Sequence, residues 1–187
     1  MAPIVGTPAA TTTPPLTPDL APTPAPSHPA ALPSPDQPTP SNRPSLATAL
    51  TIIGNRDVWI EVKSLPRAYD DALLAALDGG PFPARYAVHS FDHRITARLA
   101  AVRPDLALGA LLSARVVDPV SVLRNAKATT LWQEWTMIDQ DLVNVVHAAH
   151  ARVIAWTVND QAAAGRLSRM GVDGLCGNFP DRLAVAA

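Results

Sequence analysis

Short apolar runs alternate with stretches of helical periodicity from residue 58 to residue 176. Single alternation of apolar and polar side chains predicts a strand, and apolar side chains that recur every three or four residues predict a helix. The predicted strands are residues 58–63, 86–90, 106–112, 128–132, 153–158 and 172–176. The predicted helices are residues 69–77, 95–102, 120–126, 138–151 and 161–170, and Asp139 is a candidate cap for the fourth of them. Strands and helices in this order favour an α/β fold, in which crossover helices join parallel strands.

Proline divides the chain into two parts. Fourteen of the 20 prolines fall between Pro3 and Pro44, and residues 1–45 contain no aromatic side chain. Because such a segment cannot bury a core, we expect residues 1–45 to be a disordered, polyproline-like tail and residues 46–187 to be the folded domain. We interpret the tail as a spacer, with a proline-rich ligand for an aromatic groove as the alternative.

Charge and cysteine content exclude several functions. The formal net charge is −1 and the isoelectric point is near 6.5, so no positive field is available to hold nucleic acid or an anionic membrane surface. Cys176 is the only cysteine, which excludes an intrachain disulfide and a zinc site of paired cysteines. The first residues lack a secretory signal and no apolar run reaches about 18 residues, so we expect no membrane span and, by default, a cytoplasmic location.

The strand predicted at residues 58–63 carries charge on one face. Period two separates an apolar face from a face with Trp59, Glu61 and Lys63. Parallel strands are normally covered on both sides, so these charges must be paired, bound to a metal or in contact with a ligand. The carboxyl end of such a strand is also where active sites lie in α/β proteins. The alternative is an ion pair that reaches solvent.

Two other predicted strand ends carry candidate groups. Trp156 lies near the end of one strand, where it is either a core residue or a wall for a ligand, and Asn159 or Asp160 is placed to cap the next helix. His89 lies at the end of another strand and is a candidate acid, base or ligand, although no partner is fixed by the sequence.

The remaining histidines of the folded part are weaker candidates. His93 falls on the helix after His89 and is expected to be a surface residue. His147 and His150 are three residues apart on one predicted helix, a spacing that suits a metal but more often marks a solvated face.

Five motifs, in order and separated by helix-sized gaps, resemble the glycerophosphodiester phosphodiesterase family. They are residues 59–63 (WIEVK), 89–92 (HSFD), 103–109 (RPDLALG), 153–160 (VIAWTVND), and 171–175 (GVDGL) with 178–181 (NFPD). The resemblance implies a TIM-type (β/α) barrel that uses a divalent metal to hydrolyse glycerophosphodiesters to an alcohol and glycerol 3-phosphate.

The resemblance also implies roles for three residues. The glutamate of the Ile-Glu-x-Lys strand is a metal ligand in the family, and here it is Glu61. Lys63 is then expected to face the phosphate, and Trp156 to line the substrate cavity. The implied cofactor is Mg²⁺ or Ca²⁺, held weakly because a hard cation needs several oxygen ligands and Glu61 is one. The implied partner is a small-molecule glycerophosphodiester.

The family pattern is incomplete in this sequence. The family begins with strands that carry His-Arg-Gly and Glu-x-Asp, which supply the catalytic histidines and further metal ligands, and neither motif occurs here. We therefore expect about six of the eight strands, a fragment or a displaced reading frame at the start, and open sheet edges that favour self-association. No catalytic residue is assigned beyond the candidate His89. The alternative function is an inactive barrel fragment that binds a phosphate-bearing ligand or a partner chain.

Overall fold

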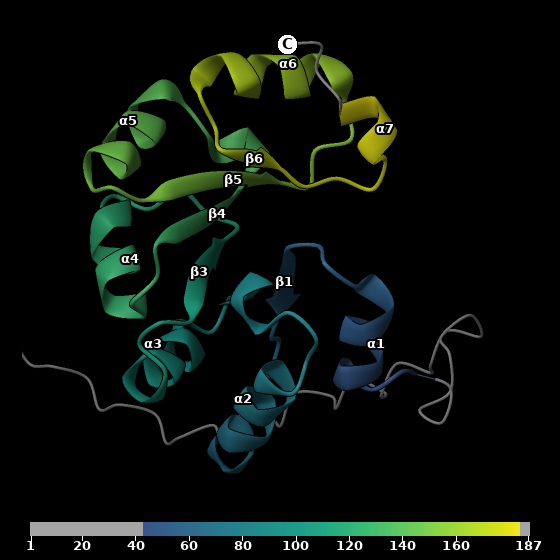
Figure 1. The fold of residues 1–187 in the computed structure, drawn as a ribbon. Helices are drawn as coiled ribbons and strands as arrows, with labels where there is room; N and C mark the ends of the chain where they lie inside the picture. Colours follow the sequence, from purple (N-terminus) through teal and green to yellow (C-terminus); the bar gives the residue numbers. More distant parts are fainter. Residues whose placement is uncertain (1–42, 184–187) are drawn as a thin grey trace, which may run out of the picture. The chain divides into compact units, whose positions relative to one another are not determined.

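A parallel sheet with helices along its outer side is built from residues 43–183, the part of the chain that the computed structural model describes (Figure 1). The tail predicted at residues 1–45 lies outside the described residues except for its last three. The strands are β1 (Val58–Glu61), β2 (Tyr86–Ser90), β3 (Ala107–Leu112), β4 (Thr130–Glu134), β5 (Arg152–Trp156) and β6 (Gly174–Leu175). The α-helices are α1 (Leu46–Ile53), α2 (Asp70–Asp78), α3 (His93–Val102), α4 (Pro119–Ala126), α5 (Gln140–Ala148), α6 (Gln161–Met170) and α7 (Pro180–Leu183).

The strands pair in the order in which they occur along the chain. Each of β1 to β5 is hydrogen-bonded in parallel to the next strand, and a helix crosses over between each pair. Figure 1 shows the sheet curling with α3 to α6 outside it, as in half of a barrel. The predicted fold class, an incomplete (β/α) barrel of six parallel strands, is therefore confirmed. Among the described residues β1 and β6 each pair with one strand only.

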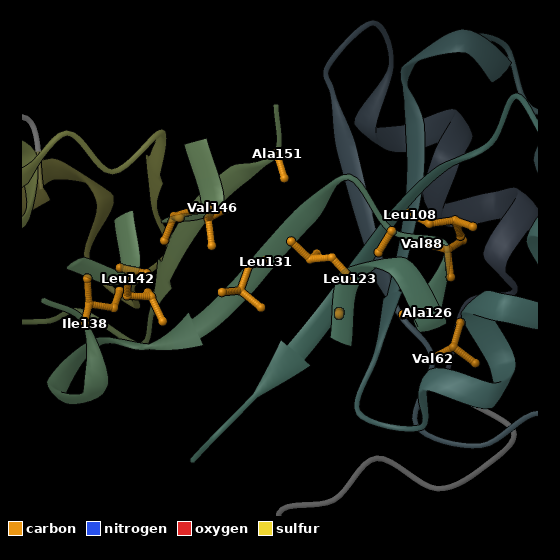
Figure 2. Packing of buried hydrophobic residues seen from close by; sticks show 14 of the residues in the cluster. Val62, Val88, Leu108, Leu123, Ala126, Leu131, Ile138, Leu142, Val146 and Ala151 are labelled. Atoms are coloured by element: carbon orange, nitrogen blue, oxygen red, sulfur yellow. The ribbon is translucent and has the colours of Figure 1, made fainter. Parts of the chain in front are cut away.

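The hydrophobic core lies between the outer face of the sheet and the helices. Val88, Leu131 and Val153 project from three strands and have no exposed surface. They pack in one cluster with helix residues such as Leu123 and Val146, as Figure 2 shows for part of the cluster. Burial of this aliphatic surface is the main stabilising contribution to the fold.

An aspartate begins each of the four helices α3 to α6. The capping side chains accept a hydrogen bond from a backbone N–H of the first turn, and they are Asp92, Asp118, Asp139 and Asp160. Each cap satisfies a donor that the helix leaves free, a contribution of about 1 kcal/mol. The predicted caps Asp139 and Asp160 are confirmed, whereas Asn159 instead accepts a hydrogen bond from the backbone of Asn178.

Several predicted boundaries are corrected by the structure. The strand predicted at residues 58–63 ends at Glu61, so Lys63 lies beyond it, and the strand predicted at 128–132 runs two residues later. The strand predicted at 172–176 is only two residues long. No element was predicted for α1, whose threonines and isoleucines are poor helix formers, or for the short α7.

Two expectations about histidines are wrong. The helix predicted at residues 138–151 ends at Ala148, and His150 follows it with a left-handed φ of 56°, so His147 and His150 do not share a helix face. His147 instead bonds to Asp173, with 2.9 Å between Nε2 and Oδ2. His93 is half-buried rather than exposed, and its Nε2 lies 3.0 Å from the carbonyl oxygen of Leu111.

Within residues 43–183, no helix combines the length and apolar character needed to cross a bilayer.

Candidate functional site

The inner face of the sheet, turned away from the hydrophobic core, carries a different set of side chains. Val58, Ile60 and Val62 belong to the core or pack against it, so the alternate residues Trp59 and Glu61 project from the opposite face. This division was predicted from the sequence. Aromatic and ionisable side chains project from this face on four strands. They are Trp59 and Glu61 of β1, His89 of β2, Trp132 of β4 and Trp156 of β5.

Three of these side chains form an aromatic cluster. The ring centroids of His89 and Trp132 are 4.2 Å apart, and Trp59 lies 5.7 Å from the first and 5.3 Å from the second. The interplanar angles of 54° to 68° are close to the edge-to-face arrangement that aromatic quadrupoles favour. Contacts between β1, β2 and β4 thus hold the imidazole against two indoles.

A glycine makes this cluster possible. Gly109 lies in β3, between the strands of His89 and Trp132. A Cβ atom at Gly109 would lie 2.8 Å from Cδ1 of Trp132 and 3.0 Å from Cβ of His89, both closer than ordinary contact. The strand therefore leaves a gap at Gly109 that the neighbouring rings fill.

A buried hydroxyl joins the ends of β1 and β2. Ser90 has no exposed surface, and its hydroxyl donates to the carbonyl of Val62 at 2.6 Å while accepting from the backbone N–H of Asp92 at 3.0 Å. The backbone N–H of Val62 also donates to the carbonyl of His89 at 2.9 Å. These bonds hold Glu61 and His89 side by side, as their parallel register requires.

A cavity of about 250 Å³ opens where the strands end. Its lining includes Phe91 and Trp156, whose rings meet nearly at right angles, at 81°, with centroids 5.4 Å apart. The residues that line this pocket are Glu61, His89, Phe91, Leu111, Trp132, Trp156, Thr157 and Cys176. The structure therefore brings three of the four predicted site residues, Glu61, His89 and Trp156, to one pocket.

His89 is neutral in this pocket at pH 7. The side chain is 6% exposed, and burial lowers its pKa from 6.5 to about 4 because the imidazolium form loses its hydration. Its Nδ1 is buried without a hydrogen-bond partner among the described residues. A neutral imidazole can accept a proton but cannot donate one as an imidazolium does. At pH 7 His89 is therefore a base rather than an acid, and a weak one because its pKa lies well below 7.

Glu61 is the one carboxylate of the pocket. Its side chain is exposed and forms no hydrogen bond or ion pair with the residues of the described range. Partial burial, followed by the negative charge of Glu61, raises the pKa of the Cys176 thiol. Because the thiol stays protonated at neutral pH, Cys176 is a weak nucleophile and a poor metal ligand.

Lys63 does not line the pocket. It lies two residues beyond the end of β1, is exposed, and makes no hydrogen bond or ion pair within residues 43–183. Sequence periodicity placed Lys63 beside Glu61 because the strand was predicted to continue to residue 63.

The residues present do not form a divalent-metal site by themselves. Within residues 43–183 there is no group of three or more histidine, cysteine, aspartate or glutamate side chains arranged to hold a metal ion. Mg²⁺ and Ca²⁺ require several oxygen ligands, whereas the pocket offers the single carboxylate of Glu61. A metal held at Glu61 would need ligands from outside these residues.

Sequence reasoning missed four residues of the site. Trp132 was predicted to end a weak strand, although it lies in the middle of β4, and Phe91 and Cys176 were not recognised as pocket residues. Gly109 was noted only as part of a motif. A glycine inside an apolar strand is a usable signal of close approach by a neighbour. The other three reach the pocket through the pairing of the strands, because Trp132 lies within β4 and Phe91 and Cys176 directly follow β2 and β6.

Comparison with known proteins assigns the described region to one group. Residues 48–182 match the sequence profile of the glycerophosphoryl diester phosphodiesterase family. A glycerophosphodiester phosphodiesterase of Caldanaerobacter subterraneus subsp. tengcongensis is 27% identical over 145 residues, which are 75% of this chain and 60% of that protein. The chain thus spans about three-fifths of the length of this relative.

Solved structures show the same fold. The crystal structure of a protein from Galdieria sulphuraria matches with a TM-score of 0.70 at 20% sequence identity. The match covers 75% of this chain and 62% of that chain. A phosphodiesterase of Oleispira antarctica, solved with its product sn-glycerol-3-phosphate, has a TM-score of 0.67 at 22% identity, covering 75% of this chain and 59% of that one. At these identities the likeness extends to the fold alone.

Proposed function

Because the chain belongs to the glycerophosphoryl diester phosphodiesterase family, we propose that it acts on glycerophosphodiesters, which it hydrolyses to an alcohol and glycerol 3-phosphate. The observation that carries the proposal is the pocket at the carboxyl ends of parallel strands, which joins Glu61 and Trp156 of two family motifs. The substrate is a small molecule, and residues 46–187 are proposed as the domain that receives it.

Each predicted residue has a proposed role. Trp156 forms an apolar wall for the substrate, and Lys63 attracts the phosphate by its positive charge from beyond the end of β1. Glu61 contributes one oxygen ligand to a divalent cation whose other ligands lie outside residues 43–183. His89 is the candidate proton acceptor of the pocket.

A coupled assay of glycerol 3-phosphate release from glycerophosphocholine tests the proposal. We expect turnover that needs Mg²⁺ or Ca²⁺ and that falls at least about 100-fold in Glu61→Gln, because a lost charged ligand costs several kcal/mol. Asp141→Asn is the matched control, because it removes one negative charge from the exposed face of α5, away from the pocket. No release with any divalent metal would contradict the proposed activity and leave the family assignment unchanged.

The second candidate is binding of a phosphate-bearing ligand without hydrolysis. The observation that favours it is the lack of a metal-binding group among residues 43–183. In that case glycerol 3-phosphate binds, Lys63→Ala weakens the binding several-fold, and no turnover accompanies it. Calorimetric titration of the same protein preparation separates the two functions, because binding without release supports this candidate alone.

A further inference from the structure

A second pocket lies at the opposite end of the sheet, where the strands begin. Its volume is about 250 Å³, and it shares no lining residue with the pocket that contains Glu61. Because neighbouring strands are parallel, their first residues meet at one edge. Six lining residues stand at or next to the starts of four strands. They are Asp57 and Trp59 (β1), Arg85 and Ala87 (β2), Ala107 (β3) and Arg152 (β5). We call this site the amino-end pocket.

The amino-end pocket has an apolar lining on the inner face of the sheet. Trp59 is opposite Ala87 in the register of β1 and β2, and Ala87 is opposite Ala107 in that of β2 and β3. The next residues, Val88 and Leu108, belong to the outer core, so the two alanines face inward. One indole beside two methyl groups leaves room for a ligand. Contacts within the aromatic cluster hold the indole in place.

The charged groups of the lining are two guanidinium groups and one carboxylate. Nη1 of Arg85 donates to Oδ1 of Asp57 at 2.9 Å, so these two charges offset each other. The guanidinium of Arg152 is exposed and makes no hydrogen bond or ion pair with the residues that the structure describes. A guanidinium keeps its charge throughout the physiological pH range. The pocket therefore has one positive charge that no lining side chain balances.

The position of Arg152 separates it from ordinary surface cations. Arginines at the ends of helices are explained by the helix dipole, whereas Arg152 begins a strand and lines a concave site together with a second guanidinium. A guanidinium fork matches the two oxygens of a carboxylate or a phosphate, and a rigid indole favours a flat apolar group. We propose that the amino-end pocket binds a small organic anion, whose carboxylate or phosphate head contacts Arg152 and whose flat body lies against Trp59.

This inference goes beyond the proposed hydrolysis and does not depend on it. The two pockets share no residue, so binding at the amino-end pocket is measured without metal and without turnover. Failure of either proposal leaves the other unchanged.

The test is a titration of the full chain with benzoate, followed through the indole N–H signals in ¹H–¹⁵N NMR spectra. We expect a dissociation constant of about 1 mM, because one exposed ion pair and a small apolar contact stabilise the complex. Benzamide, which has the same shape without the charge, should bind at least about fivefold more weakly. The signal of Trp59, identified by its loss in Trp59→Phe, should shift. The signal of Trp156 is the internal control, because Trp156 lines the other pocket.

Phenyl phosphate identifies the head group. It carries the same ring as benzoate on a phosphate, so the ligand that binds more tightly shows which oxyanion the site prefers. Either preference supports the proposal, provided that the signal of Trp59 shifts and that of Trp156 does not.

Substitutions of opposite sign then locate the charge. Arg152→Gln should weaken benzoate binding about five- to tenfold, whereas Arg169→Gln, which removes the same charge from the exposed end of α6, should change it less than about twofold. Asp57→Asn should tighten binding about two- to fivefold, because it releases Arg85 for the anion. Asp141→Asn is its matched control on α5.

A steric variant tests the shape of the pocket. Ala107→Leu fills the space beside Trp59 without changing any charge, so it should weaken benzoate binding at least about tenfold. The NMR spectrum verifies the fold of each variant, and Ala107→Val replaces Ala107→Leu if the latter does not fold. Equal binding of benzamide, benzoate binding unchanged in Arg152→Gln, or a shift of Trp156 in place of Trp59 would overturn the proposal.

Discussion

On its outer face the sheet carries aliphatic side chains with no exposed surface, whereas on its inner face it carries indoles, an imidazole and a carboxylate. Leu131 and Trp132 are neighbours in β4 and illustrate the contrast, because the first lies in the aliphatic core and the second in the aromatic cluster. The outer face is covered by α3 to α6 (Figure 1). The inner face opens to a pocket at the strand ends.

The two faces also differ in how well their polar groups are satisfied. Five buried side-chain polar atoms have no hydrogen-bond partner within residues 43–183. Four of them are at inner-face positions, and they belong to His89, Thr130, Trp132 and Trp156. The fifth, the carbonyl oxygen of Gln133, belongs to a side chain whose amide already bonds to two backbone carbonyls. The outer face therefore contributes more to the stability of the fold, whereas the inner face buries polar groups without partners, which lowers the stability.

The difference between the two faces predicts the largest loss of stability when a core side chain is shortened. Leu131→Ala should lower the free energy of unfolding by about 2–5 kcal/mol, because it leaves a cavity among residues that cannot collapse. Leu111→Ala is the matched change on the inner face and should cost less, because its space joins the pocket. Urea denaturation measures the free energy of unfolding of both variants. Equal losses would contradict the difference between the two faces.

The next effect concerns the gap in β3. Gly109→Ala should lower the free energy of unfolding by about 1–3 kcal/mol, because the added methyl group collides with Trp132 and His89. Gly165→Ala is the control, because its added methyl group makes only ordinary contact, at 3.5 Å from Nη1 of Arg169, within α6. That change should raise stability by up to about 1 kcal/mol. Thermal melts distinguish the opposite signs, and two changes of the same sign would contradict this account.

An effect of comparable size should follow pH through His89. The folded protein has a His89 pKa of about 4, below the 6.5 of a free imidazole, so between these values the unfolded chain binds a proton that the folded chain does not. Stability therefore falls as pH decreases from about 6.5 to about 4, by at most about 3 kcal/mol, and the effect stops growing at lower pH.

Comparison with His89→Gln isolates this contribution from the aspartates that titrate at lower pH. Urea midpoints measured from pH 7 to pH 4 should slope more steeply for the native sequence than for the variant. Parallel slopes would show that His89 is not kept neutral by its surroundings.

The weakest expected effect is self-association through the sheet edges. β1 offers four residues at one edge and β6 only two at the other, so few backbone hydrogen bonds are available to a second copy. We expect light scattering to report a monomer at micromolar concentration and a growing dimer fraction toward millimolar. A constant monomer mass over this range would contradict the expectation that the edges are adhesive.

Local sequence pattern was sufficient to predict the six strands, the helices between them and the two faces of the first strand. The alternation in residues 58–62 separates core from site because a side chain must point to one face or the other. The aspartates before α5 and α6 marked the helix starts, because a capping hydrogen bond joins residues only three positions apart in the sequence.

The arrangement across strands could not be predicted in the same way. The contact of Trp59 with Trp132 joins residues 73 positions apart, and it depends on register and on the gap at Gly109. Lys63 was misplaced because the periodicity continues past Glu61 while the backbone pairing does not. Pattern thus identifies which residues share a face of one strand, and tertiary pairing decides which of them meet.

The sequential strand order has a consequence for how the chain reaches this structure. Pairing closes segments that range from 28 residues between Val58 and Tyr86 to 20 between Ile154 and Gly174. Closing loops of similar length costs similar entropy at each step, so no strand must wait for a distant one before it can pair. Contacts between residues that are close in the sequence are associated with rapid folding. The sheet can therefore form from any adjacent pair of strands, because each further strand pairs with one that is already in place.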